Sequence, residues 1–282
     1  MGGSGLLGTS LVSHLVKCGH EVITHSCTNT TQFQGDIGDQ QATFNLLNQI
    51  RPKVIVNLIG LTDVDRCEAE PLQAYRLNVR TVENIVSWIR QETESCHLIH
   101  ISTDHIYDGT SPHTEDQVAL TNYYAFSKYA GELVARRVPS TIFRTNFFGR
   151  SHCVKRTSLT DWLFRALTQQ ESIQVFDNVL FSPLSISTLS EMLELSIRIR
   201  PVGVFNLGSH GGMSKADFAF AFAEESDLST KVMQRVSTDQ IKLIKTYRPK
   251  DMRMDCSYFE NVLGLKLPSL RNEIKKVVKE YV

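Results

Sequence analysis

The fold is indicated first by residues 98–132, which read LIHISTDHIYDGTSPHTEDQVALTNYYAFSKYAGE. The apolar run 98–101 is typical of a buried strand, and the polar residues Ser102, Thr103 and Asp104 follow it directly. Ligands of open parallel sheets bind outside the carboxyl ends of the strands. We therefore expect these three side chains to lie at a ligand site.

A helix is predicted after this strand, and in it Tyr124 and Lys128 are four residues apart on one face. An ammonium beside a phenol favours the phenolate, which lowers the pKa of a phenol from about 10 toward the pH of effective proton transfer. This predicts proton transfer from Tyr124 to a carbonyl oxygen, coupled to hydride transfer, with Thr103 or else Ser102 hydrogen-bonding that oxygen. The pair alone is weak evidence, because Tyr and Lys are common on exposed helix faces. The neighbouring Tyr123 has no cation four residues later.

Composition favours a globular protein that acts on a small molecule. Of its 282 residues 41% are hydrophobic, and 30 basic residues balance 30 acidic ones. This balance argues against nucleic acid and anionic membranes as partners. No apolar run approaches the ~20 residues of a membrane span and no signal peptide is evident, so we expect a cytoplasmic protein. Six isolated cysteines without metal-ligand spacing predict neither a metal site nor disulfides.

The first residues predict a dinucleotide-binding turn. Gly2, Gly5 and Gly8 precede an amphipathic helix expected over 6–17, and 21–24 is predicted as the next strand. A cloning remnant would also begin with glycines. The strand that should precede Gly2 is missing, so we expect the natural product to begin several apolar residues upstream. We also expect the 282-residue form to bind dinucleotide poorly or to be unstable.

The cofactor is predicted to be NADPH, with NADH as the alternative. An NAD-selective Rossmann unit carries an Asp or Glu at the end of its second strand, where it binds the ribose 2′-OH. At that position this chain has His25-Ser26-Cys27, and it has no arginine there for the 2′-phosphate of NADP. Asp36, followed by Ile37, is expected either to contact the adenine end or to cap a helix over 40–50.

Two further segments are expected beside the cofactor. A strand buried on both faces is predicted within 52–60, where Asn57 and Gly60 leave room for a ribose. A long helix is predicted over 71–91, and Asn78 inside it should either face solvent or satisfy a buried backbone group.

The order of these elements predicts an α/β protein. Alternating strands and helices indicate a Rossmann-like, doubly wound parallel sheet without its first strand, as a dinucleotide-binding domain over 1–150. Residues 151–282 should form mainly a smaller substrate lobe, with segments that return to the first domain. Helices are expected at 157–169, 187–199, 215–225 and 269–281. The cations Arg150, Lys155, Arg156 and Arg165 are candidates for a diphosphate, although each is more simply a solvated charge.

Together these motifs resemble the extended short-chain dehydrogenase/reductases, and within them the dTDP-4-dehydrorhamnose reductases. The matching segments span nearly the whole chain: Gly2–Gly8, Asp36–Ile37, Arg51–Asn57, Thr62–Glu68, Asn78, Ser102–Gly109, Tyr124–Glu132, Phe143–Thr145 and Tyr247–Asp255. The resemblance implies NAD(P)H-dependent reduction of a 4-keto-6-deoxy sugar nucleotide.

The resemblance also implies roles for individual residues. Catalysis would fall to Thr103, Tyr124 and Lys128, and substrate contacts to Thr103, Asp104 and Arg248. The cofactor would be held by Gly2, Gly5, Leu6, Leu7, Asp36, Ile37, Asn57, Gly60, Asn78, Ser102, Tyr124 and Lys128.

Departures from the family pattern leave alternatives open. Residues 181–184 differ from the specificity segment of the family, so the identity of the sugar nucleotide stays open. An epimerase or dehydratase of the same superfamily is an alternative, although Asp104-His105 replaces the Asp-Glu pair of dehydratases. Another is a non-catalytic NADP-binding regulatory subunit, like the β subunit of methionine adenosyltransferase. The chain is also compatible with a homodimer.

Overall fold

The structure is a computed structural model that describes residues 1–27, 31–91, 95–110, 112–241 and 245–282. The chain folds into two compact units. Unit 1 consists of Met1–Thr103, Asn122–Arg144 and Ser190–Phe205, and unit 2 of Asp104–Thr121, Thr145–Leu189 and Asn206–Val282. The chain thus passes between the two units several times.

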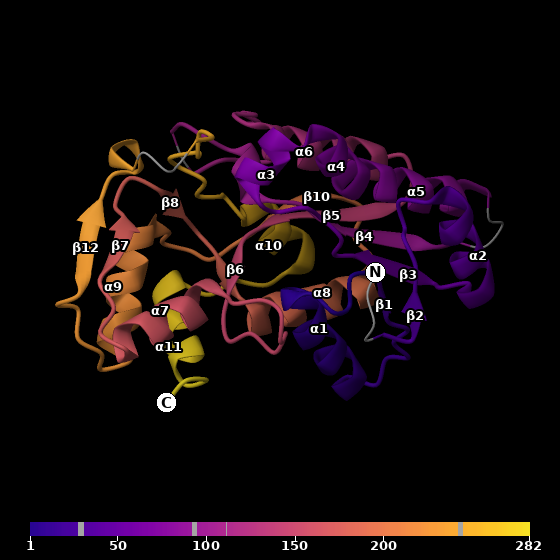
Figure 1. Ribbon diagram of the computed structural model, residues 1–282. Coiled ribbons are helices and arrows are strands. Elements are labelled where there is room, and N and C mark those ends of the chain that lie inside the picture. Colours follow the sequence, from indigo (N-terminus) through magenta and orange to yellow (C-terminus); the bar gives the residue numbers. More distant parts are fainter. Residues whose placement is uncertain (28–30, 92–94, 111, 242–244) are drawn as a thin grey trace. The chain divides into compact units, whose positions relative to one another are not determined.

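Unit 1 is built on a sheet with the strand order β10–β5–β4–β3 (Figure 1). The strands are β3 (Val54–Asn57), β4 (His97–Ile101), β5 (Ser140–Thr145) and β10 (Gly203–Leu207). Both β3 and β5 run parallel to β4, with Ile99 opposite Val56 on one side and Thr141 on the other. Every residue of β4 is buried, as expected for an inner strand of a parallel sheet.

Helices cover both faces of this sheet, which confirms the predicted α/β class. In Figure 1, α4 (Pro71–Tyr75), α5 (Thr81–Gln91) and α6 (Tyr123–Ala135) lie above the strands, and α1 (Leu6–Lys17) and α8 (Ile186–Ile199) below them. The helix α2 (Gln40–Ile50) contacts α5, and α3 (Val64–Ala69) contacts α6. The bounds of α1 and α2 are those predicted, because the apolar spacing that sets them is local.

The predicted helix over 71–91 is confirmed, with one irregularity. A π-helical turn, η1 (Arg76–Arg80), joins α4 to α5. Turns of this kind are rare and concentrate at functional sites. The predicted site residue Asn78 lies within it and is buried.

The prediction of a strand at 21–24 is wrong. The strand begins one residue later, as β1 (His25–Ser26), and pairs in parallel with β2 (Phe33–Gln34). The amide of Thr24 donates to the side-chain oxygen of Gln32 at 2.9 Å, where a ladder would offer a backbone carbonyl. In the described part of the chain, β1 and β2 form a sheet of their own, and β3 is an end strand of the larger sheet.

Unit 2 surrounds its own aromatic core, in which Phe148 and Phe181 meet Phe218 edge-on. Three strand pairs contribute: β6 (Phe147–Phe148) with β9 (Leu184–Ser185), β7 (Ile173–Phe176) with β12 (Met233–Val236), and β8 (Leu180–Phe181) with β11 (Met213–Ser214). The helices are α7 (Leu159–Thr168), α9 (Lys215–Glu225), α10 (Ser257–Leu263) and α11 (Leu270–Val278), with short 3₁₀ turns η2 (Asp104–Ile106) and η3 (Thr238–Gln240). Across the described ranges, no helix is long and apolar enough to cross a membrane.

Candidate active site

The face of α6 that carries Tyr124 and Lys128 is buried. The side chain of Asn122 accepts a hydrogen bond from the amide of Ala125 at 2.8 Å, which caps the helix and fixes where it begins. Tyr124 is only 6% exposed and Lys128 only 4%. These values decide against an ordinary exposed Tyr/Lys face.

Lys128 reaches the end of β4. Its Nζ donates to the carbonyl oxygen of Ile101 at 2.6 Å, just before Ser102 and Thr103. Burial lowers the pKa of Lys128 to about 8, although the charge of Glu132 acts in the opposite direction. This ammonium therefore titrates close to neutral pH.

Two predicted cofactor residues lie beside this ammonium. A Cβ added to Gly60 would stand 3.1 Å from Oδ1 of Asn78 and 3.5 Å from Nζ of Lys128. The side chain of Asn78 accepts from the amide of Leu61 at 2.7 Å and donates to Ser127 Oγ at 2.8 Å. Of the two interpretations of Asn78, satisfaction of a buried backbone group is confirmed, and the residue fixes the loop after β3 against α6.

Asn57 is fully buried, and its side chain hydrogen-bonds to other residues of the protein. Its Oδ1 accepts from the amide of Ile59 at 3.2 Å, and its Nδ2 lies 3.2 Å from Nδ1 of His100 on β4. Burial lowers the pKa of His100 well below its ordinary value, so this imidazole is neutral beside the positive charge of Lys128.

Ser102 is hydrogen-bonded to a buried ion pair. Glu132 and Arg144 are both 0% exposed, and Arg144 Nη2 donates to Glu132 Oε2 at 2.7 Å while its Nε lies 3.1 Å from Oε1. Ser102 Oγ donates to the same carboxylate at 2.5 Å. Sequence reasoning matched Glu132 and Arg144 to family motifs but gave them no role, since nothing local shows that residues 12 apart form a pair.

The glycine loop before α1 packs closely against the start of that helix. A Cβ on Gly8 would lie 2.3 Å from the carbonyl oxygen of Gly2, so the loop and the helix touch backbone to backbone. Gly5 is the N-cap of α1 and has no side chain to occupy the first amides of the helix, next to Leu6 and the buried Leu7. This packing argues against a cloning remnant.

Asp36 does not cap α2, so that interpretation is wrong. The cap is Asp39, whose Oδ1 accepts from the amide of Ala42 at 2.7 Å. Asp36 instead accepts from the amide of Gly38 at 2.8 Å and forms an ion pair with Arg76. The next residue, Ile37, is buried in the core of unit 1.

In unit 2, the predicted substrate residues Asp104 and Arg248 gather around Lys215. Asp104 accepts from Asn146 Nδ2 at 2.8 Å. Burial lowers the pKa of Lys215, the charge of Asp104 opposes that change, and the charge of Arg248 adds to it. Burial together with the same two cations lowers the pKa of His105 to about 3. Sequence reasoning missed Lys215, although a cation at the start of a helix is unfavourable and so was a signal.

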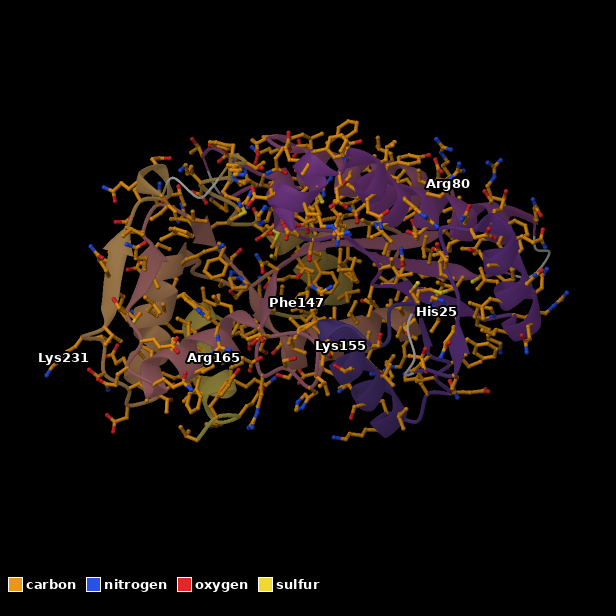
Figure 2. All side chains as sticks on the ribbon, viewed as in Figure 1. His25, Arg80, Phe147, Lys155, Arg165 and Lys231 are labelled. Atoms are coloured by element: carbon orange, nitrogen blue, oxygen red, sulfur yellow. The ribbon has the colours of Figure 1, made fainter. Side chains whose placement is uncertain are left out.

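The other cations proposed for a diphosphate are exposed. They are Arg150, Lys155, Arg156 and Arg165, of which Figure 2 labels Lys155 and Arg165. Their exposure agrees with the interpretation as solvated charges.

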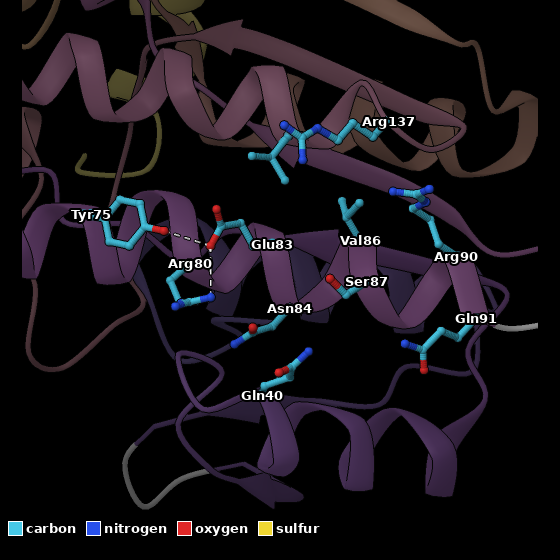
Figure 3. A pocket seen from close by; sticks show the side chains of 11 residues that line it. Gln40, Tyr75, Arg80, Glu83, Asn84, Val86, Ser87, Arg90, Gln91 and Arg137 are labelled. Carbon is cyan, nitrogen blue, oxygen red and sulfur yellow. Dashed lines mark hydrogen bonds and ion pairs between the residues drawn. The ribbon is translucent and has the colours of Figure 1, made fainter.

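A polar cavity of about 530 Å³ lies along α5 (Figure 3). There Glu83 accepts a hydrogen bond from Tyr75 Oη at 3.0 Å and pairs with Arg80 at 3.4 Å. Its lining, as far as the structure describes it, includes none of the predicted site residues.

A family model described as "RmlD substrate binding domain" matches residues 1–282. The chain belongs to this family. The resemblance to the dTDP-4-dehydrorhamnose reductases, which the motifs predicted, is thereby confirmed. Among curated relatives, SpsK, a spore coat polysaccharide biosynthesis protein of Bacillus subtilis, is 28% identical over 88% of this chain and 85% of its own length. The dTDP-4-dehydrorhamnose reductase of Shigella flexneri is 26% identical over 99% of this chain and 96% of its own.

Solved structures of similar proteins show the same fold. The dTDP-4-dehydrorhamnose reductase of Bacillus anthracis, solved in complex with NADP, has a TM-score of 0.88 at 23% identity over 99% of this chain and 97% of that one. The enzyme WbmG of Bordetella bronchiseptica, in complex with NAD and UDP, has a TM-score of 0.82 at 20% identity over 99% and 93%. These likenesses confirm the Rossmann-like class predicted for this RmlD family member.

Proposed function

We propose that the protein is an NADPH-dependent reductase of a 4-keto-6-deoxy sugar nucleotide. The observation that carries the proposal is the buried pair of Tyr124 and Lys128 on α6, with Lys128 bonded at the end of β4 directly before Ser102 and Thr103. The reductase names and bound dinucleotides of the relatives support it.

The residues of this site have separable roles in the proposed reaction. A bound nicotinamide dinucleotide would supply the hydride. Tyr124 holds the proton for the carbonyl oxygen, and the ammonium of Lys128 stabilises the phenolate left behind. Thr103 donates a hydrogen bond to that oxygen. Ser102 is the weaker candidate for this bond, because its hydroxyl already donates to Glu132.

The cofactor is assigned to the glycine loop and to the residues around Lys128. Gly2 and Gly5 let the backbone and the first amides of α1 meet the pyrophosphate. Gly60 and Asn78 lie next to Lys128 and are assigned to the ribose of the cofactor.

Asp104, Lys215 and Arg248 of unit 2 are assigned to the substrate. Burial and the charge of Arg248 lower the pKa of Lys215, and a bound anion such as a nucleotide diphosphate would offset the repulsion between these two cations. The carboxylate of Asp104 can accept from a sugar hydroxyl.

The direct test is a reductase assay. With NADPH at concentrations that saturate even a weak site, purified protein should oxidise NADPH when dTDP-4-dehydrorhamnose is added, in proportion to the protein present. Protein that binds NADPH but does not oxidise it would contradict the reductase assignment and favour the non-catalytic subunit.

Raising the pH should lower kcat/KM with an apparent pKa near 8. Above this value Lys128 loses the charge that stabilises the Tyr124 phenolate. The measurement is kcat/KM against pH at saturating NADPH. A value of kcat/KM that stays flat to pH well above 8 would contradict this role.

Lys128→Met should lower both kcat and the affinity for NADPH, because one ammonium serves both. An unchanged affinity for NADPH would contradict the proposed contact between Lys128 and the ribose.

The free energy of unfolding should depend on the protonation of Lys128. Since burial lowers the pKa of Lys128 from 10.5 to about 8, the unfolded chain binds more protons between these values, and stability rises with pH across that window. Urea unfolding at several pH values should show this rise in the parent. Lys128→Met should reduce it, and an unchanged slope in the variant would assign it to other groups.

The protein should use NADPH at least as well as NADH. The residues at β1, His25 and Ser26, offer no carboxylate to repel a 2′-phosphate. Measured kcat/KM with NADPH should therefore be at least equal to that with NADH. A large preference for NADH would contradict this assignment.

A further inference from the structure

Asp108 belongs to unit 2 and has no role in the reaction proposed above. It follows η2, four residues after the substrate residue Asp104. Its carboxylate bonds to the stretch 247–251, which carries Arg248. On the basis of the proposed function, which assigns Arg248 to the substrate, we propose that Asp108 is a positioning residue. It holds Arg248 in place for the diphosphate of a nucleotide ligand.

The carboxylate of Asp108 is bonded to residues on both sides of Arg248. Before Arg248, the phenol of Tyr247 donates to Oδ2 of Asp108 at 2.8 Å. After it, the amide of Lys250 donates to Oδ1 at 2.8 Å, and the amide of Asp251 donates to the same oxygen at 3.4 Å. One side chain therefore restrains the chain before and after the arginine.

Asp108 is itself fixed by the residue before it. Tyr107 is 0% exposed, and its Oη donates to Oδ1 of Asn206 at 2.6 Å. Its ring also stacks on His113, with 5.1 Å between the ring centroids. The carboxylate of Asp108 is therefore an anchor on a buried part of unit 2.

The backbone around Arg248 converts these bonds into a defined position. Pro249 is buried, and a proline restricts the residue before it to extended conformations. The carbonyl of Lys250 accepts from the amide of Leu180 on β8 at 2.8 Å, which fixes the far side. The Cα of Arg248 is thereby set, and its guanidinium is placed by the torsions of its side chain.

Arg248 needs this restraint because it lies among other ionisable groups that it repels. Burial is the main cause that lowers the pKa of Lys215 and of His105, and the charge of Arg248 adds to it in both. Without a bound anion, repulsion from Lys215 favours movement of the guanidinium into water. The bonds from Asp108 oppose this movement, so less ordering is needed when a diphosphate binds.

The test is calorimetric binding of dTDP and dTMP to the full chain. Asp108→Ala should raise the Kd of dTDP roughly tenfold, about the loss of one charge-assisted phosphate contact. The Kd of dTMP should rise less, because dTMP lacks the second phosphate. The matched control is Asp116→Ala, which removes an exposed acid of the same unit that accepts from the hydroxyl of Thr114. It should change neither value.

A double-variant cycle separates positioning from general damage to unit 2. In protein that carries Arg248→Met, Asp108→Ala should have no further effect on dTDP, since Asp108 acts through Arg248. Tyr247→Phe removes one of the bonds from a side chain that is 48% exposed, so the fold should not suffer. It should weaken dTDP binding less than Asp108→Ala does, and this effect should also vanish in Arg248→Met.

Losses that multiply in the double variants, or equal weakening of dTDP and dTMP, would overturn the role of Asp108. A parent protein that does not bind dTDP would overturn it as well. The reductase assay reports on the proposed function separately. Coupled binding without oxidation of NADPH would keep the role of Asp108 and contradict the reductase, whereas turnover without coupling would do the reverse.

Discussion

Replacing Tyr124 by phenylalanine should lower kcat by roughly 100-fold or more and leave the affinity for NADPH nearly unchanged. The substitution deletes only the transferable proton, and general acid catalysis by a positioned side chain contributes about 10²–10⁴-fold. The ring itself is retained in its buried position against Leu61 and Cys67, so the fold should not suffer. Steady-state kinetics and NADPH titration measure the two quantities.

The neighbouring residue provides the control. Tyr123 is on the same helix and is only partly buried, and Tyr123→Phe should keep turnover close to that of the parent. If Tyr124→Phe retained a rate within severalfold of the parent, another group would have to donate the proton. Equal losses in both variants would point to a general effect on α6.

Glu132→Ala should destabilise the protein more than any other single change proposed above, by about 3–5 kcal/mol in the free energy of unfolding. It removes a carboxylate that is 0% exposed and leaves the guanidinium of Arg144 buried without its 2.7 Å partner. Ser102 also loses its acceptor. Urea unfolding measures this free energy, and an m-value equal to that of the parent would show that the two proteins can be compared directly.

An exposed ion pair is the matched control. Arg66 and Glu70 lie four residues apart on the surface, at 49% and 50% exposure of their side chains, and Glu70→Ala should cost less than about 1 kcal/mol. The double variant Glu132→Leu, Arg144→Met should recover part of the loss, since it leaves no unpaired charge. A cost for Glu132→Ala as small as that of the surface pair would mean that water reaches Arg144.

Local signals in the sequence were enough for most elements. The bounds of α1, α2 and α9 were predicted to the residue, because apolar spacing and the polar cap at the start of a helix lie within one or two turns. The same holds for Tyr124 and Lys128, whose common face follows from their spacing on α6. The segment 21–24 was misjudged, since a strand also needs partners that the local sequence does not show.

The candidate site is a different matter, because its bonds join residues far apart in the chain. Asn78 binds Leu61 and Ser127, Ser102 shares the carboxylate of Glu132 with Arg144, and Lys215 meets the charges of Asp104 and Arg248. By itself the sequence determined the fold class, the family and the shared face of Tyr124 and Lys128 on α6. Only the tertiary structure decided that the hydroxyl of Ser102 is committed to Glu132, because buried polar groups are satisfied by whichever partners packing brings to them.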